Sequence, residues 1–102
     1  MAIEKYPSVL GQPVELTDER RGHILKRHPA VAPFLDRIHE VLTRPDRVRR
    51  STYDPNVLLF SLFYCDILDG KHLVVVVKTD GRRFILTVYI TRRLVGGQPY
   101  EG

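Results

Sequence analysis

Residues 72–91 read HLVVVVKTDGRRFILTVYIT, two apolar runs separated by Asp80-Gly81. An Asp-Gly pair between two runs of strand-forming residues is a strong signal for a β-hairpin with a two-residue turn. We therefore predict antiparallel strands at 72–78 and 83–91. Since the run at 73–77 is apolar at every position, we expect both faces of the sheet to be covered there, by the N-terminal arm, the C-terminal tail or another subunit.

Two more strands are expected before this hairpin. Residues 57–64 are almost wholly apolar, whereas residues 47–53 are rich in strand formers but polar. Turn-forming residues follow each run, at Asp54-Pro55-Asn56 and at Asp69-Gly70. The predicted sheet is therefore a four-stranded antiparallel β-meander.

Alternation along the last strand predicts which of its side chains lie under the helices. Residues two apart point to the same face of a strand, so one set should be covered and the other should form a polar face. The covered set is Phe84, Leu86, Val88 and Ile90, and the polar face is Arg83, Ile85, Thr87, Tyr89 and Thr91.

Two helices are predicted ahead of the strands. The first spans 18–28, because Thr17 is a good N-cap and Pro29 disfavours helical geometry at the residue before it. The second spans 31–43, where apolar residues recur at three- and four-residue spacing before Pro45. The predicted fold class is α+β, with two N-terminal helices packed on one face of the four-stranded antiparallel β-meander.

A chain of 102 residues is long enough for one compact domain and too short for two. We therefore expect a single domain over residues 1–102. Residues 1–13, which contain two prolines and a glycine, are predicted to be an irregular arm. Residues 94–102, which contain Gly96-Gly97, are predicted to be a flexible tail.

Composition points to a basic protein of the cytoplasm. Sixteen Lys and Arg against twelve Asp and Glu give a net charge of +4, which favours a phosphate-bearing partner such as RNA. Cys65 is the single cysteine, so no disulfide can form within the chain, as suits a reducing compartment. Residues 1–7 contain no signal-peptide run, and the longest apolar stretch, 57–65, is too short for a membrane span.

Two of the four histidines lie close together in GHILKRHP, residues 22–29. Histidine suits proton transfer near neutrality, and the neighbouring Lys26 and Arg27 would hold a phosphate. Cleavage of RNA through its 2′-hydroxyl needs a base, an acid and a cation, and this segment offers all three. The histidines match no metal-ligand spacing, so neither a metal nor a cofactor is expected.

The spacing of the histidine pair raises a geometric difficulty. Five residues along a helix turn the side chain through about 140°, so His23 and His28 share a site only if the helix ends near Arg27. Structural roles also remain open for both residues. His28 would suit the C-terminal end of a helix dipole, and His23 could be a partly buried ring that holds the helix to the sheet.

Two further sets of residues are candidates for phosphate binding. Thr87, Tyr89 and Thr91 form a row of hydroxyls on the last strand, ahead of Arg92-Arg93, although Thr and Tyr are also common strand formers. The other set is basic, and it would either track a phosphate backbone or protect an edge strand from aggregation. Its members include Arg47, Arg49, Arg50 and Arg83.

These motifs, in this order, resemble the phage and bacterial nuclease families grouped with barnase, EndoU, colicin and RelE toxins. The resemblance covers residues 14–95: Leu16-Thr17 leading into 23–29, Pro45-Asp46 with the basic strand after it, and the strands at 73–78 and 84–91. It implies a helices-then-sheet fold and metal-independent RNA cleavage. By matching position, it nominates His23, His28, Thr87, Tyr89 and Thr91.

The function predicted from the sequence is a small endoribonuclease, acting as a toxin or in phage-related RNA cleavage. His23 would be the general base, His28 the general acid, and Arg83 or Lys26 the phosphate cation. Tyr89 and Thr91 would position the RNA, and an antitoxin-like protein is an expected partner. The alternative is a non-catalytic basic module that binds RNA or a protein, with the open sheet face available for a homodimer.

Overall fold

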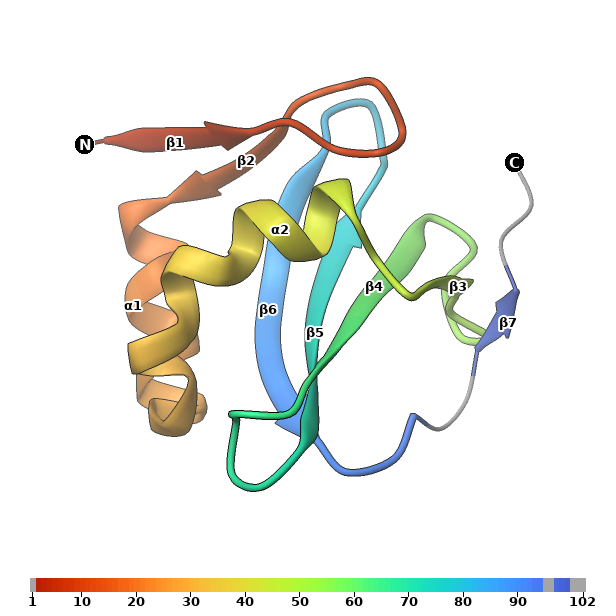
Figure 1. Ribbon diagram of the computed structural model, residues 1–102. Helices are drawn as coiled ribbons and strands as arrows, with labels where there is room; N and C mark the ends of the chain where they lie inside the picture. The colour runs from red at the N-terminus through yellow and green to blue at the C-terminus, as the bar shows by residue number, and fades with distance from the viewer. Residues whose placement is uncertain (1, 95–96, 100–102) are drawn as a thin grey trace.

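The computed structural model describes residues 2–94 and 97–99, which form one mixed sheet with helices on one side (Figure 1). In chain order the elements are β1 (Ile3–Tyr6), β2 (Val14–Thr17), α1 (Asp18–Arg27), the 3₁₀-helix η1 (Pro29–Arg37), α2 (Ile38–Thr43), β3 (Arg47–Arg50), β4 (Val57–Tyr64), β5 (Lys71–Lys78), β6 (Phe84–Thr91) and β7 (Gln98–Pro99). No helix in the described part of the chain is long and apolar enough to cross a membrane.

The structure is α+β, but the predicted four-stranded antiparallel meander is wrong. The described residues form a seven-stranded sheet in the order β1-β2-β6-β5-β4-β3-β7, and β2 pairs with β6 in parallel. Strands β3 to β6 do pair antiparallel in sequence order. Strands β1 and β7 were missed because each has four residues or fewer and shows no apolar alternation. In β2, Val14 and Leu16 do alternate with polar residues, but so short a run is equally consistent with the lead-in to the helix.

The arm and the tail also differ from the predictions. Ile3–Tyr6, expected to be irregular, pairs antiparallel with β2, and Gln98–Pro99, expected to be flexible, pairs with the outer edge of β3. The backbone N–H and C=O groups of a sheet edge offer hydrogen bonds that no composition pattern reveals. The rest of the predicted tail, residues 95–96 and 100–102, lies outside the described residues.

The first helix begins and ends as its sequence signals indicate. The Thr17 hydroxyl accepts a hydrogen bond from the Arg20 backbone N–H at 3.1 Å, which is an N-cap. At the other end His28 leaves helical geometry (φ −132°, ψ 67°), while its N–H still donates to the Ile24 carbonyl at 2.7 Å. Pro29 after it accounts for the change, because proline disfavours helical geometry at the preceding residue.

The predicted second α-helix, 31–43, is wrong over most of its length. The chain forms a 3₁₀-helix over Pro29–Arg37 and becomes α-helical only at Ile38–Thr43. Pro33 explains the difference, since it has no N–H to donate to the carbonyl four residues earlier. The apolar stripe still reaches the sheet, with Val31, Ile38 and Val41 all buried.

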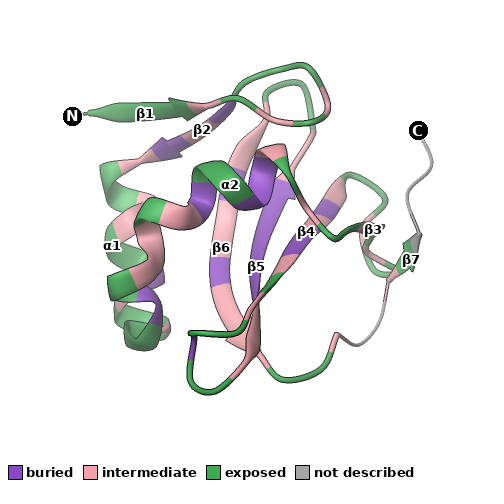
Figure 2. Cartoon of the chain, in the orientation of Figure 1, coloured by how far each residue is buried: buried purple, intermediate pink, exposed green. Residues whose placement is uncertain are grey.

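The core lies between these helices and one face of the sheet. Figure 2 shows the buried residues gathered on β2, β4, β5 and α2. Strand β5 is the centre, because it pairs along its whole length with β4 on one side and β6 on the other. Its five apolar residues at 73–77 are at most 8% exposed. The expectation that both faces of this strand are covered is confirmed.

A β-bulge at Leu86 changes which side of β6 faces the core. Val76 pairs with Thr87, but Val77 pairs with Ile85, so Leu86 has no partner on β5. The alternation therefore shifts by one residue, as a bulge requires. Ile85, predicted on the polar face, is 0% exposed in the core, while Phe84 and Leu86, predicted under the helices, are only partly buried.

A polar cluster joins η1 and α2 to the turn between β4 and β5. The Arg37 guanidinium donates to both carboxylate oxygens of Asp66, at 2.8 and 2.6 Å, and lies 4.7 Å from the centre of the Tyr64 ring. The Tyr64 hydroxyl donates to Glu40 at 2.6 Å. The hydrogen bonds from Arg37 lower the pKa of the Asp66 carboxyl below its ordinary value of 3.8.

Phe60 and Phe63 provide a test of where the core lies, because both are on β4 but they face opposite sides. Phe60 is 0% exposed and Phe63 is 48% exposed. We expect Phe60→Ala to lower the free energy of unfolding by about 3–5 kcal/mol, and Phe63→Ala to lower it by about 1 kcal/mol or less. Urea unfolding followed by circular dichroism measures both, and equal losses would contradict the assigned core.

The Arg37–Asp66 pair predicts a pH-dependent stability. A carboxyl whose folded-state pKa is lowered contributes stability above its ordinary pKa and loses that contribution as the pH falls through the folded-state value. We expect Asp66→Asn to lower the urea midpoint at pH 7 and to match the wild type at pH values well below 3.8. Asp69→Asn, in the same turn with φ 65°, is the control for charge alone, since Asn also tolerates positive φ. A deficit that persists in acid would contradict the ion pair as its cause.

Candidate functional site

Helix α1 lies beside a free stretch of the outer edge of β6 (Figure 1). Strand β2 covers this edge only at its start, because the two strands pair at the single position Glu15↔Phe84. Beyond that position α1 packs against β6, and the bulge at Leu86 lies where the two meet. A cleft of about 280 Å³ opens between them.

The cleft brings together four of the residues that the sequence nominated. His23, Arg27 and His28 line it from α1 and its end, and Thr87 lines it from β6. Three more residues that line it, Arg20, Ile24 and Leu86, were not predicted as site residues. The full lining is Arg20, His23, Ile24, Arg27, His28, Leu86 and Thr87.

His23 and His28 reach the same cleft because α1 ends at Arg27, before His28. His23 lies within the helix, three residues after Arg20 and four before Arg27, which is the spacing of one helix side. His28 is outside regular helical geometry, so its side chain does not follow the 100° rotation per residue. Its ring lies 6.1 Å from the ring of Tyr89 on β6, at an interplanar angle of 41°.

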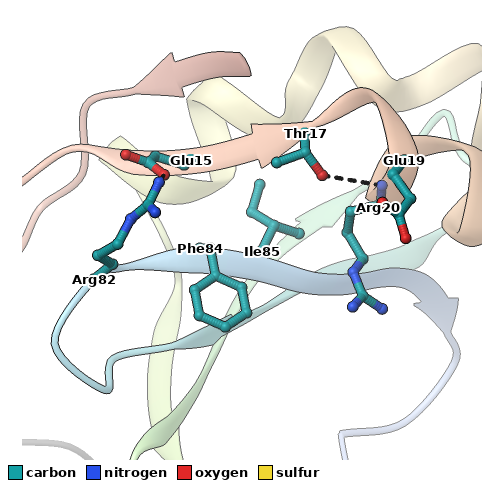
Figure 3. A pocket seen from close by; sticks show the side chains of 7 residues that line it. All are labelled: Glu15, Thr17, Glu19, Arg20, Arg82, Phe84 and Ile85. Atoms are coloured by element: carbon teal, nitrogen blue, oxygen red, sulfur yellow. Dashed lines mark hydrogen bonds and ion pairs between the residues drawn. The ribbon is translucent and has the colours of Figure 1, made fainter. Parts of the chain in front are cut away.

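Arg20 and Arg27 make the cleft cationic. Among the described residues, neither guanidinium forms an ion pair. Arg20 also borders a second pocket of about 260 Å³ between β2 and the start of β6, shown in Figure 3. The lining of that pocket holds two carboxylates, Glu15 and Glu19, against two guanidinium groups, and Arg82 pairs with Glu15. The helical spacing to His23 and Arg27 is the signal that could have identified Arg20 from the sequence.

Two predicted phosphate cations lie outside this cleft. The Arg83 guanidinium donates to the side chain of Gln12, and its backbone carbonyl accepts from the Glu15 N–H at 2.9 Å. Arg83 is therefore held at the end of the hairpin, against the N-terminal arm. Lys26 is exposed on α1 and does not line the cleft.

We name the face of the sheet that η1 and α2 do not cover the far face. It carries the predicted hydroxyls. Thr87, Tyr89 and Thr91 alternate along β6 and are paired with Val76, Val74 and His72 of β5. Thr87 lines the cleft and Tyr89 contacts His28, so the far face continues from the cleft. Thr91 is further along β6, and its hydroxyl donates to the Arg93 carbonyl at 2.7 Å.

The arginines of β3 lie three strands across the sheet from β6, where α1 packs. Arg47 and Arg49 point to the far face, in cross-strand rows that end at Tyr89 and Thr87 of β6. Three strand spacings separate them from those residues, which is about 14 Å. Arg49 is only 7% exposed, whereas Arg50 is exposed and alternates to the other side of β3. These three arginines are therefore not part of the cleft.

The arrangement at α1 offers proton-transfer groups and fixed positive charge in one place. Two imidazoles, two guanidinium groups and a hydroxyl line the cleft, and a phenol ring contacts one imidazole. Such a set can bind an oxyanion and move protons to and from it. Among the described residues, no three or more His, Cys, Asp or Glu side chains gather as a metal site would require.

Comparison with known proteins adds no relative to these observations: no family model, no curated protein and no solved structure matches the chain.

Proposed function

We propose that the protein is an endoribonuclease that cleaves RNA through the 2′-hydroxyl, in the cleft between α1 and β6. The observation that supports this most directly is that the same cleft is lined by His23, His28 and two arginines that form no ion pair with a described residue. The resemblance to the barnase, EndoU, colicin and RelE group points in the same direction. In this proposal the protein acts in the cytoplasm as a toxin or a phage-related nuclease.

The proposed reaction moves two protons across the cleft. His23 takes the proton of the 2′-hydroxyl, and the resulting oxygen attacks the adjacent phosphorus. The bond from phosphorus to the 5′-oxygen breaks, and His28 gives its proton to that leaving oxygen. The products are a 2′,3′-cyclic phosphate and a free 5′-hydroxyl, and no other reactant is needed. Paired acid and base groups contribute typically about 10²–10⁴-fold each to such a rate.

Arg20 and Arg27 are the cations of this proposal, in place of Arg83 and Lys26. Both line the cleft, and neither is neutralised by a described carboxylate. A guanidinium group can hold two phosphate oxygens at once, which suits the charge that builds up on them during attack. Arg83 is held by Gln12 instead, at the other end of the hairpin.

Tyr89 and Thr91 have different roles in the proposal. Tyr89 lies against the His28 ring, so it orients the general acid and offers a surface for a base. Thr91 acts indirectly, because its hydroxyl accepts from the Arg93 N–H at 3.3 Å and donates to the Arg93 carbonyl. It is therefore a positioning residue for the turn that follows β6.

A module that binds RNA without cleaving it remains the second candidate. The observation that favours it is the basic far face, where Arg47 lies in the same cross-strand row as Tyr89. Such a module, or an inactive member of the nuclease group, would use the face to hold RNA or a protein such as an antitoxin. A homodimer through the far face belongs to this candidate.

Loss of either cleft histidine is expected to abolish RNA cleavage. We expect His23→Ala and His28→Ala each to lower the rate on a single-stranded RNA, with EDTA present, by about 100-fold or more. Gel electrophoresis measures the rate, and mass spectrometry identifies the cyclic phosphate. His39→Ala is the matched control, because His39 is exposed on α2 outside the cleft and its loss should leave the rate unchanged.

The result that separates the two candidates is cleavage by the wild type. Cleavage that survives both histidine substitutions would contradict the proposed mechanism. A wild-type protein that binds RNA but leaves it intact would contradict the nuclease and support the binding module.

A further inference from the structure

A second basic cleft lies at the end of β6, away from α1. It has a volume of about 470 Å³ and lies where the first residues of β3 and β5 meet the turn after β6. Its lining is Asp46, Arg47, His72, Arg92, Arg93 and Leu94. Three of these six side chains are arginines, and the proposed cleavage reaction uses none of the six.

Its positive charge is not neutralised by the residues around it. Among the described residues, Arg47, Arg92 and Arg93 form no ion pair. Asp46 is the carboxylate in the lining, and its oxygen accepts the Phe63 backbone N–H at 2.7 Å. Asp46 is therefore engaged in holding β4, and the cleft keeps a net positive charge that attracts an anion.

His72 adds a polar atom that has no partner in the described structure. Its Nδ1 is buried without a hydrogen bond to a described residue, and the centre of its ring lies 5.2 Å from that of the Phe63 ring, at an interplanar angle of 70°. A buried nitrogen without a partner costs free energy unless a ligand or water satisfies it. The turn that carries the arginines is held by the two hydrogen bonds between Thr91 and Arg93.

The far face joins this cleft to the cleft at α1. His72 is paired with Thr91, and Arg47 lies in the cross-strand row that ends at Tyr89. Thr87 marks the first cleft, and the four residue steps from Thr87 to Thr91 span about 13 Å. Tyr89 stands between the two clefts on the same face, with an aromatic ring on which a base could stack.

We propose that this second cleft binds another phosphate of the RNA strand that is cut at α1. The substrate is then a single-stranded oligonucleotide long enough to reach both clefts, since a basic groove with an aromatic ring is the usual combination for single strands. The inference takes the position of the cleavage site, at α1, from the proposed function. The binding of the strand is tested separately below.

Binding is measured with an octanucleotide whose 2′-hydroxyls are methylated, so that it cannot be cleaved. By fluorescence polarisation, we expect Arg47→Ala and Arg92→Ala each to weaken binding about tenfold. Each should also reduce the slope of log affinity against log salt by about 0.7, the effect of one lost phosphate contact. Arg44→Ala is the matched control, because Arg44 is exposed at the end of α2 and lies outside both clefts.

Cleavage is measured in parallel on a dinucleotide and on an unmodified octanucleotide. We expect Arg92→Ala to lower kcat/KM about tenfold on the octanucleotide and to leave the dinucleotide unchanged, since a dinucleotide cannot reach the second cleft. Circular dichroism melts of each variant confirm that it is folded.

The outcomes separate the two proposals. If neither substrate is cleaved but Arg47→Ala and Arg92→Ala weaken oligonucleotide binding, the second cleft stands and the nuclease is wrong. If those variants bind as tightly as the wild type, or if Arg44→Ala weakens binding as much, the second cleft is not a phosphate site. Displacement of the octanucleotide by a poly-glutamate peptide at equal concentration of charge would also overturn it, because the cleft would then prefer any acidic chain.

Discussion

Strand β5 is hydrogen-bonded along both of its edges, and the rest of the fold is placed by that pairing. Its apolar residues are buried on both faces, and the turns at Asp69-Gly70 and Asp80-Gly81 that join it to β4 and β6 set its register. Pairing with β4 and β6 then sets which side chains lie under η1 and α2 and which reach the far face. Because β2 joins β6 at one position only, the remaining edge of β6 receives α1, and the histidine cleft forms there.

Features that depend on neighbouring residues in the sequence, such as turns, apolar runs and helix caps, were predicted well. The valine run of β5 and the Thr17 cap act through neighbouring residues, and each predicted the right structure. The Asp80-Gly81 pair predicted the hairpin correctly but not its loop, which runs over residues 79–83 between the pair Lys78↔Phe84 rather than over two residues. The missed features depend on contacts between distant segments. Strand β1 exists because Tyr6 and its neighbours meet Val14 and its neighbours, and nothing within either segment announces that pairing. Pro33 did not argue against the predicted α-helix, because proline is tolerated in the first turn. The helical segment in fact begins at Pro29, which places Pro33 inside it.

The candidate site was predictable in part, for the same reason. His23, His28 and Thr87 carry recognisable chemistry, and the structure places them along one cleft. The spacing argument allowed the two histidines to share a site only if the helix ended near Arg27, and the helix does end there, ahead of Pro29. Arg83 was assigned to a phosphate because it is basic and near the last strand. Its actual partner, Gln12, comes from the arm, whose position the sequence did not predict.

The bulge at Leu86 gives β6 two halves of opposite phase. Counted back from Thr91, every second residue faces away from the core as far as Thr87; counted forward from Phe84, the same rule would send Thr87 and Tyr89 inward. One unpaired residue thus allows a single strand to contribute Ile85 and Val88 to the core and still turn its hydroxyls outward. A sequence of this fold without the bulged residue would need its Thr and Tyr shifted by one position along the strand to build the same surface. Counting residues back from Thr91, the end of β6, therefore identifies the site residues better than counting forward from Phe84, its start.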